Sequence, residues 1–562
     1  MLRVSAAAQP RTVEVAPPSS SAPVPPLTSS SEARAPSDVV LDVRGLKTYF
    51  YTYDGVVHAL EGVKFKIRRG ETLGLVGETG CGKSVTAFSI TRLIPDPPGR
   101  IMEGRILLHG ANLLWGLDQE ATFKEVRKSG RYTIKRKYRR LRDVQRRMIA
   151  VRGSMISMIF QEPMLALNPV FRVSNQLGEA LTLHRLQPII AEMFQAADMG
   201  KPMVGDAKAS PGTDGAAPSS SPATQAAVDR LVDAAVHRNS TEMRTAAGEI
   251  AGSTGLTSLG TEAYYTAREE AVFESDQLKH RINRCFGRTR LSGLQRTYLK
   301  YRTQAAALDD QLREVYLQEM RQERPERAQL RSIRRHKRLL QIRSLVFRLP
   351  GVGRHVRRPL ETELFWRSVR LLEQVSIANP AQVARSYPHE LSGGMVQRVM
   401  IAMALSSEPE ILLADEPTTA LDVTIQAQIL ELMRNLKSRV GTAILLITHD
   451  LGVIAEVADR VCVMYAGNVI ETAPVAELFR RPLHPYTQGL LASIPRVDDP
   501  SKKLESIPGS VPNLITPPTG CRFHPRCPFA MPVCKEKAPP TTVEGPQHSV
   551  ACFLYNGAED VS

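Results

Sequence analysis

Eight consecutive residues within the first hundred have the types and spacing of a phosphate-binding loop. They fit the pattern G-x-x-x-x-G-K-[ST] and read Gly77-Glu78-Thr79-Gly80-Cys81-Gly82-Lys83-Ser84. Glycines allow backbone N–H groups to curl around a β-phosphate, and a helix that follows adds the positive end of its dipole. In this chemistry Lys83 bridges the β- and γ-phosphates, and Ser84 holds Mg²⁺.

The elements around this loop are those that the motif requires. A short apolar run, 72–76, predicts a buried strand that enters the loop, and 85–93 predicts a helix that leaves it. A chance glycine-rich turn before a helix is the competing explanation. With all four fixed positions and both flanks correct, the sequence favours a nucleotide site.

Two adjacent carboxylates, Asp415 and Glu416, follow a second predicted buried strand, 411–414. Carboxylates at the end of an apolar strand are costly unless a cation or a reacting water lies beside them. Asp415 suits the Mg²⁺ shell, and Glu416 suits polarisation of the water that attacks the γ-phosphate. An acidic strand end often only begins a turn, but together with the phosphate loop it indicates an NTPase.

A third motif, Leu391-Ser392-Gly393-Gly394-Met395-Val396-Gln397-Arg398, precedes this strand. Here the chain resembles the ABC (ATP-binding cassette) ATPases, over most of residues 39–185 and 361–490. The resemblance implies a Q-loop glutamine at Gln161, which touches Mg²⁺ and the reacting water, and a switch histidine at His449. It also implies a D-loop at 420–422 and an aromatic that stacks on adenine. Phe50 is the expected aromatic, with Tyr49 as the less favoured choice.

The leucine-serine-glycine-glycine motif is predicted to bind the nucleotide of a second subunit. The Ser392 hydroxyl and the amides of Gly393 and Gly394, at a helix N-terminus, suit a γ-phosphate presented from outside. The resemblance implies that two such ATPases pair head to tail with ATP between them. This chain holds one set of motifs, so a partner ATPase is expected, in a heterodimer.

Longer segments resemble the ATPases of oligopeptide and dipeptide importers. They are Gln161–Pro169, Asp415–Gln428, His484–Thr487 and the cysteine-containing C-terminal segment. The resemblance implies two transmembrane permease subunits, an external peptide-binding protein, and a peripheral position on the cytoplasmic face of the plasma membrane. An ATPase acting on nucleic acid or ribosomes through a basic insertion is the alternative. No nucleic-acid partner is expected, because such proteins usually carry two ATPase domains.

The expected fold is α/β, a P-loop NTPase of the ABC-ATPase type with a helical subdomain. Further strands are expected at 39–43, 63–67, 105–108 and 443–448. The chain is predicted to begin with a disordered tail (1–38). The core comes in two parts, 39–185, with a basic extension at about 115–150, and 361–480. Between them lies a helical and disordered insertion (186–360), and a C-terminal tail (481–562) follows. Within the insertion, 201–224 reads as a linker and 291–346 as helix.

Composition adds limits to this interpretation. Apolar residues make up 43% of the 562 residues and charged residues 23%, as in ordinary globular proteins. No run approaches the roughly 18 apolar residues of a membrane span, and no secretory pattern opens the chain. The net charge of +16 predicts an acidic partner, a membrane surface or nucleic acid. The basic insertion is therefore read as a solvated helical hairpin first, and as a lipid-binding or nucleic-acid-binding arm as alternatives.

Four of the seven cysteines crowd the C-terminal end: Cys521, Cys527, Cys534 and Cys552. Four thiolates in a compact tail are able to ligate Zn²⁺ or an iron–sulfur cluster. The spacing C-x5-C-x6-C-x17-C lacks the C-x2-C of common zinc sites, and some relatives in the group that this chain resembles carry a [4Fe–4S] cluster. The sequence therefore favours [4Fe–4S] over zinc, with four metal-free thiols as the remaining alternative.

Overall fold

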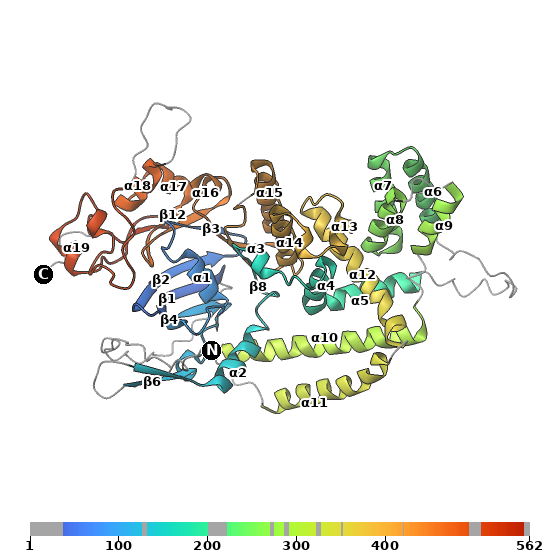
Figure 1. Cartoon of the computed structure of the whole chain (residues 1–562), viewed down its shortest axis with the longest axis horizontal. Coiled ribbons are helices and arrows are strands. Elements are labelled where there is room, and N and C mark those ends of the chain that lie inside the picture. The colour runs from blue at the N-terminus through green and yellow to red at the C-terminus, as the bar shows by residue number, and fades with distance from the viewer. Residues whose placement is uncertain are drawn as a thin grey trace, which may run out of the picture.

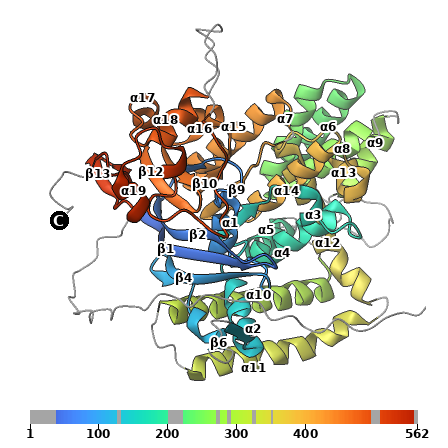
Figure 2. The same cartoon turned by 60° about the vertical axis from the view of Figure 1, so that its left-hand side comes forward.

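The structure is a computed structural model that describes residues 38–125, 132–199, 222–269, 275–285, 291–321, 327–349, 352–419, 421–493 and 507–555. The predicted tail at 1–38 and linker at 201–224 therefore lie almost wholly outside the described residues. Figures 1 and 2 show two sheets side by side at one end of the molecule, with helices extending from them to the other end.

The first sheet is antiparallel and covers one side of the nucleotide loop. Its strands lie in the order β2-β1-β4-β5. Their bounds are β1 Val39–Tyr51, β2 Val56–Arg68, β4 Gly99–Leu108 and β5 Ala111–Asn112. The predicted strands at 39–43, 63–67 and 105–108 are the ends of these longer strands. Their inward side chains, such as Leu41, Leu60 and Ile106, are fully buried.

The second sheet has the order β13-β14-β12-β11-β3-β10-β9-β8, and its strands from β11 to β8 are parallel. The bounds are β3 Thr72–Val76, β8 Ile156–Ile159, β9 Ile411–Asp415, β10 Ala443–Ile447, β11 Arg460–Tyr465, β12 Asn468–Pro474, β13 Thr542–Gly545 and β14 His548–Val550. The predictions for β3, β9 and β10 are confirmed. Strands β3, β9 and β10 are buried along their whole length, which explains their unbroken apolar sequences.

Helices cover the parallel sheet and continue into the helical subdomain. Those of the core and tail are α1 Lys83–Ile90, α3 Pro163–Ala166, α4 Val173–His184, α13 Pro380–Arg385, α14 Gly393–Leu405, α15 Val423–Val440, α16 Leu451–Val457, α17 Val475–Arg480, α18 Pro485–Ala492 and α19 Pro532–Glu536. The predicted basic extension forms a hairpin and a helix, β6 Ala121–Glu125, β7 Tyr132–Arg136 and α2 Tyr138–Met148.

The predicted insertion is helical where it is described. It comprises α5 Leu186–Met199, α6 Pro222–Val236, α7 Ser240–Thr254, α8 Thr257–Glu269, α9 Ser275–Cys285, α10 Gly293–Met320, α11 Arg327–Arg343, a 3₁₀ turn Ser344–Arg348 and α12 Val352–Gln374. The helices expected over 291–346 are α10 and α11. No helix among the described residues combines the length and the apolar character needed to cross a bilayer.

The predicted boundaries of the insertion are not packing boundaries. Helix α12 runs through the boundary at 360 and ends at Gln374. The side chains of Leu317 and Met320, at the end of α10, are 6% and 2% exposed and belong to the core beneath the antiparallel sheet. Arg147 of α2 pairs with Glu319 of α10 at 2.7 Å. The insertion therefore contributes side chains to the same core as the cassette.

Candidate nucleotide-binding site

The phosphate loop lies between β3 and α1, as predicted. Gly77 has φ +152°, and a Cβ there would lie 2.2 Å from the carbonyl oxygen of Met464. Gly82 has φ +103°, and its Cβ would lie 2.7 Å from the carbonyl oxygen of Ala59. Both positions therefore require glycine, because any side chain would clash with backbone of a neighbouring strand or loop.

Lys83 folds back over this loop. Its side chain is buried, and Nζ donates hydrogen bonds to the carbonyl oxygens of Gly77 at 2.7 Å and Glu78 at 3.1 Å. Both acceptors are neutral, and no carboxylate among the described residues forms an ion pair with this ammonium group. A phosphate group in the loop would supply that counter-ion.

Asp415 and Ser84 form the best candidate for the Mg²⁺ position. The Ser84 hydroxyl donates to Asp415 Oδ1 at 3.0 Å, and Asp415 Oδ2 is buried with no hydrogen-bond partner among the described residues. Burial raises the pKa of Asp415 to about 6. A buried carboxylate oxygen that lacks a partner, beside a hydroxyl, fits a hard cation with oxygen ligands. The geometry therefore agrees with the predicted roles of both residues.

The three predicted catalytic residues meet at one edge of the parallel sheet. Gln161, Glu416 and His449 follow β8, β9 and β10, which are neighbours in the sheet. Gln161 Nε2 donates to Glu416 Oε2 at 3.1 Å, and His449 Nδ1 lies 3.0 Å from Glu416 Oε1. A carboxylate only accepts, so Nδ1 carries the hydrogen of that bond. Glu416 is thus held from two sides beside Asp415.

The Ser392 motif does not join this site within the chain. Ser392 caps the N-terminus of α14, where its hydroxyl accepts from the N–H of Met395 at 3.4 Å. Ser392 and Gly393 are exposed, and Gly394 is partly exposed. In both views α14 lies apart from α1 (Figures 1 and 2). Within the described residues, the start of α14 is therefore exposed and lies away from the phosphate loop of the same chain.

The two adenine-stacking candidates differ in their surroundings. The Tyr49 hydroxyl donates to Glu61 at 3.0 Å, and its ring lies 4.3 Å from the ring of His58. Phe50 lies against Gly99, where a Cβ would come within 2.7 Å of the Phe50 ring. Tyr49 is thus engaged within the chain, and Phe50 stays the predicted stacking residue.

In the predicted D-loop, Asp422 caps α15 by accepting from Ile425 N–H at 2.9 Å, and residue 420 lies outside the described residues.

Two residues of the C-terminal tail, for which no role at this site was predicted from the sequence, hold the phosphate loop. The Glu78 N–H donates to the hydroxyl of Tyr486 at 2.9 Å. The Glu78 carboxylate accepts from both Nη atoms of Arg526, at 2.8 and 3.1 Å. Tyr486 belongs to the histidine-proline-tyrosine-threonine motif, which marked the group but gave no target for the hydroxyl. No sequence signal pointed to Arg526, which lies 448 residues from Glu78.

The four C-terminal cysteines line one small pocket. Burial raises the pKa of the thiols of Cys521 and Cys527, and raises that of Cys552 to about 11. Within the described part of the chain, however, no three His, Cys, Asp or Glu side chains are grouped so that they would hold a metal ion. The predicted iron–sulfur and zinc sites are therefore not shown by the structure, although the four thiols line one pocket.

Comparison with known proteins gives two family matches. Residues 60–214 and 305–419 match the family described as ABC transporter. Residues 470–534 match the oligopeptide/dipeptide transporter, C-terminal region. The second match includes Tyr486 and Arg526, the two residues that hold the phosphate loop.

Three relatives match nearly the whole chain. A probable peptide ABC transporter ATP-binding protein, y4tR, of Sinorhizobium fredii is 33% identical over 92% of this chain and 96% of its own length. The oligopeptide transport ATP-binding protein AppD of Bacillus subtilis is 33% identical over 92% of this chain and 98% of its own. The dipeptide transport ATP-binding protein DppD of the same organism is 32% identical over 92% and 95%.

Proposed function

This chain belongs to the ABC transporter ATP-binding proteins that carry the oligopeptide/dipeptide transporter C-terminal region, and we propose that it powers the import of oligopeptides or dipeptides. The observation that carries the proposal is the meeting of Gln161, Glu416 and His449 beside the phosphate loop. The names of the relatives supply the substrate class. None of the three relatives is named for nucleic acid, so the nucleic-acid alternative is set aside.

In this proposal the residues of the site have separate roles in binding and hydrolysing ATP. The loop amides and Lys83 bind the phosphates, and Ser84, Asp415 and Gln161 would hold Mg²⁺, which would supply charge neutralisation for the phosphates. Glu416 accepts the proton of the attacking water. His449 and Gln161 keep the Glu416 carboxylate in one orientation through both of its oxygens.

A complete site needs a second ATPase chain. The exposed amides of Gly393 and Gly394 at the start of α14 suit the γ-phosphate of ATP held by a partner. The proposed assembly is a head-to-tail heterodimer of ATPases on two transmembrane permeases, with an external peptide-binding protein that supplies substrate. The chain would lie on the cytoplasmic face of the plasma membrane as a peripheral subunit.

For the four C-terminal cysteines the proposal is a shared [4Fe–4S] cluster, with zinc and metal-free thiols as the alternatives. Its support is that all four thiols line one pocket. Protein purified without oxygen is expected to be brown and to contain iron and sulfide, and Cys521→Ser should lose both. Colourless protein without iron would contradict the cluster.

The test of the transport proposal is a pull-down of the tagged chain from detergent-solubilised membranes of its native host. Two integral membrane proteins and a second ATPase are expected in stoichiometric amounts. RNA or ribosomal proteins in place of membrane proteins would contradict the proposal.

A further inference from the structure

Helix α11 is attached to the molecule by one face. The side chain of Ile333 is 5% exposed, Lys337 pairs with Asp309 of α10, and Ser344 is buried. These positions are four and seven residues apart and therefore lie on one side of a helix. That side faces α10.

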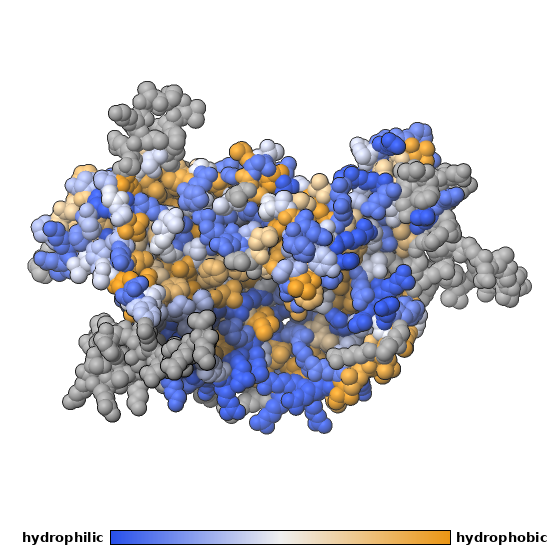
Figure 3. All heavy atoms as spheres, viewed as in Figure 1, coloured by the Kyte–Doolittle hydropathy of each residue, from blue (hydrophilic) through white to orange (hydrophobic). Residues whose placement is uncertain are grey.

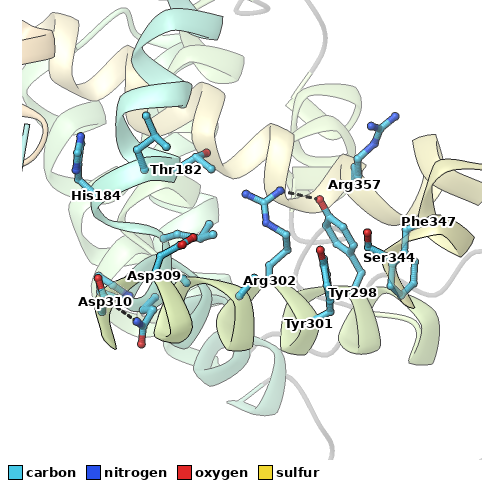
Figure 4. A pocket seen from close by; sticks show the side chains of 16 residues that line it. Thr182, His184, Tyr298, Tyr301, Arg302, Asp309, Asp310, Ser344, Phe347 and Arg357 are labelled. Carbon is cyan, nitrogen blue, oxygen red and sulfur yellow. Dashed lines mark hydrogen bonds between the residues drawn. The ribbon is translucent and has the colours of Figure 1, made fainter. Parts of the chain in front are cut away.

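The 3₁₀ turn after α11 continues the attachment. The ring of Phe347 lies 5.4 Å from that of Tyr298 and 5.9 Å from that of Tyr301, both on α10. Figure 4 shows the three rings together at one end of a pocket that α4, α5, α10, the 3₁₀ turn and α12 line. The aromatic contacts fix which way the turn faces, so the opposite face of 331–349 is directed outward.

The first half of this outward face is basic. Arg331, Arg334, Arg335 and Arg338 are exposed, and none of the four makes an ion pair within the described part of the chain. The sequence from Arg327 to Arg348 contains no aspartate or glutamate. Charges that are usually balanced on a helix surface are here of a single sign.

The second half of the outward face is apolar. Its five large side chains are between 49% and 63% exposed and recur at helical spacing: Leu339, Ile342, Leu345, Val346 and Leu349. Figure 3 shows this apolar patch at the lower right, beside strongly hydrophilic surface. An exposed apolar patch rimmed by charge is typical of an interaction site rather than of plain solvent contact.

We propose that these nine residues, the four arginines and the five apolar side chains, form a surface that binds an anionic lipid bilayer. The apolar half would enter the boundary between headgroups and acyl chains, and the arginines would lie among the lipid phosphates, which suit their forked donors. A bilayer offers both an apolar interior and dense negative charge along the whole of helix α11, which is about 25 Å long. The charge complementarity and the unpaired apolar stripe therefore both select anionic lipid.

Helix α2 extends the basic half. It lies near the start of α11 in both views (Figures 1 and 2). Its exposed arginines are Arg139, Arg140, Arg142 and Arg146, and Arg147 anchors it to α10 through Glu319. The basic extension and the insertion thus both contribute exposed arginines to this side of the molecule.

This inference depends on the proposed function only in that a transporter places the chain at a membrane. The purified full chain, without permeases, is mixed with vesicles of phosphatidylcholine alone or with phosphatidylglycerol and floated on a density gradient. Flotation is expected with the anionic vesicles at low salt, weaker at physiological salt, and absent with the neutral vesicles. Failure to float would overturn the lipid surface and leave the ATPase and transport proposals standing.

Two variants and a matched control make the test specific. Each arginine near an anionic surface strengthens partitioning about fivefold, so R334Q/R335Q/R338Q should weaken it by about a hundredfold. L339S/I342S should weaken it by on the order of a hundredfold, since each buried side chain contributes at least about 1.5 kcal/mol. The control R439Q/R480Q/R481Q removes the same charge from exposed positions on α15 and around the end of α17 and should float like the wild type.

Binding of fluorescent ATP by every variant verifies that the protein is folded. Equal loss in the control and in the α11 variant would show that only net charge matters, which contradicts the proposal. If the wild type ignores anionic vesicles but binds a single-stranded RNA oligonucleotide through the same three arginines, the surface is a nucleic-acid site and the proposal is wrong.

Discussion

The contact between Arg526 and Glu78 predicts that the C-terminal tail controls ATP affinity. The Arg526 side chain is only 6% exposed, and both of its Nη atoms reach the Glu78 carboxylate. Its Nε and Nη2 also donate to the carbonyl oxygens of Pro508 and Ile507, which ties the guanidinium to the tail. The phosphate loop is thereby held in place before nucleotide arrives.

The size of the effect follows from what the ion pair restrains. Fixing the backbone of one residue costs about 1–2 kcal/mol, and Arg526→Met would free the Glu78 side chain and loosen its backbone. The loop remains anchored by β3, by α1 and by the Tyr486 hydroxyl, so the lower end of that range applies. About 1 kcal/mol corresponds to a roughly fivefold rise in the Kd for ATP.

The assay is titration of the purified chain with a fluorescent ATP analogue and Mg²⁺, arranged as a double-mutant cycle. Arg526→Met and Glu78→Gln should each weaken binding about fivefold, and the double variant should be no weaker than either, because both remove one interaction. Arg522→Met is the matched control, since Arg522 lies in the same tail but bonds to Ala466 and Glu61. Wild-type affinity in Arg526→Met, or additive losses in the cycle, would refute the reasoning.

Three further predictions concern the same core. Lys83→Ala should abolish detectable ATP binding in the same titration, because the loop loses the buried ammonium that would pair with the phosphates; affinity within threefold of wild type would contradict the assignment. Burial raises the pKa of Asp415 to about 6, so its contribution to stability is present below the unfolded pKa near 3.9 and lost as pH rises through about 6. Without Mg²⁺, wild type should therefore gain about 2 kcal/mol over Asp415→Asn between pH 7 and 4 in thermal unfolding; parallel pH profiles would contradict this. Leu317→Ala should cost about 2–4 kcal/mol of stability, whereas exposed Leu294→Ala on the same helix should cost little; equal effects would show that α10 is not part of the core.

Part of the site could be predicted from the strands that carry it. The unbroken apolar sequences of β9 and β10 predict buried strands, and Glu416 and His449 follow them. Strand β8 was not predicted, and Gln161 and His449 were expected from the family resemblance, so the meeting of the three side chains is a finding of the structure. The motifs also predicted that the four cysteines gather, because they lie within a short segment.

Contacts between distant segments could not be predicted in this way. The bond from Arg526 to Glu78 depends on how the tail crosses the loop, and no local pattern encodes that path. The packing of Leu317 and Met320 under the antiparallel sheet was missed for a related reason. The strongly basic composition of the insertion favoured a solvated hairpin. The apolar side chains at the end of α10 nevertheless bury that end of the helix against the core.

Glu416→Gln in the assembled transporter is the most direct test of whether Glu416 drives ATP hydrolysis for peptide import. ATP turnover and uptake of radiolabelled peptide are measured together in proteoliposomes that contain the native partner ATPase and permeases. ATP should still bind, while both turnover and uptake fall by on the order of 10²–10⁴-fold, because the amide keeps the shape of the carboxylate but cannot accept the proton of water. Wild-type turnover in this variant, or turnover that collapses while peptide uptake continues, would contradict the account.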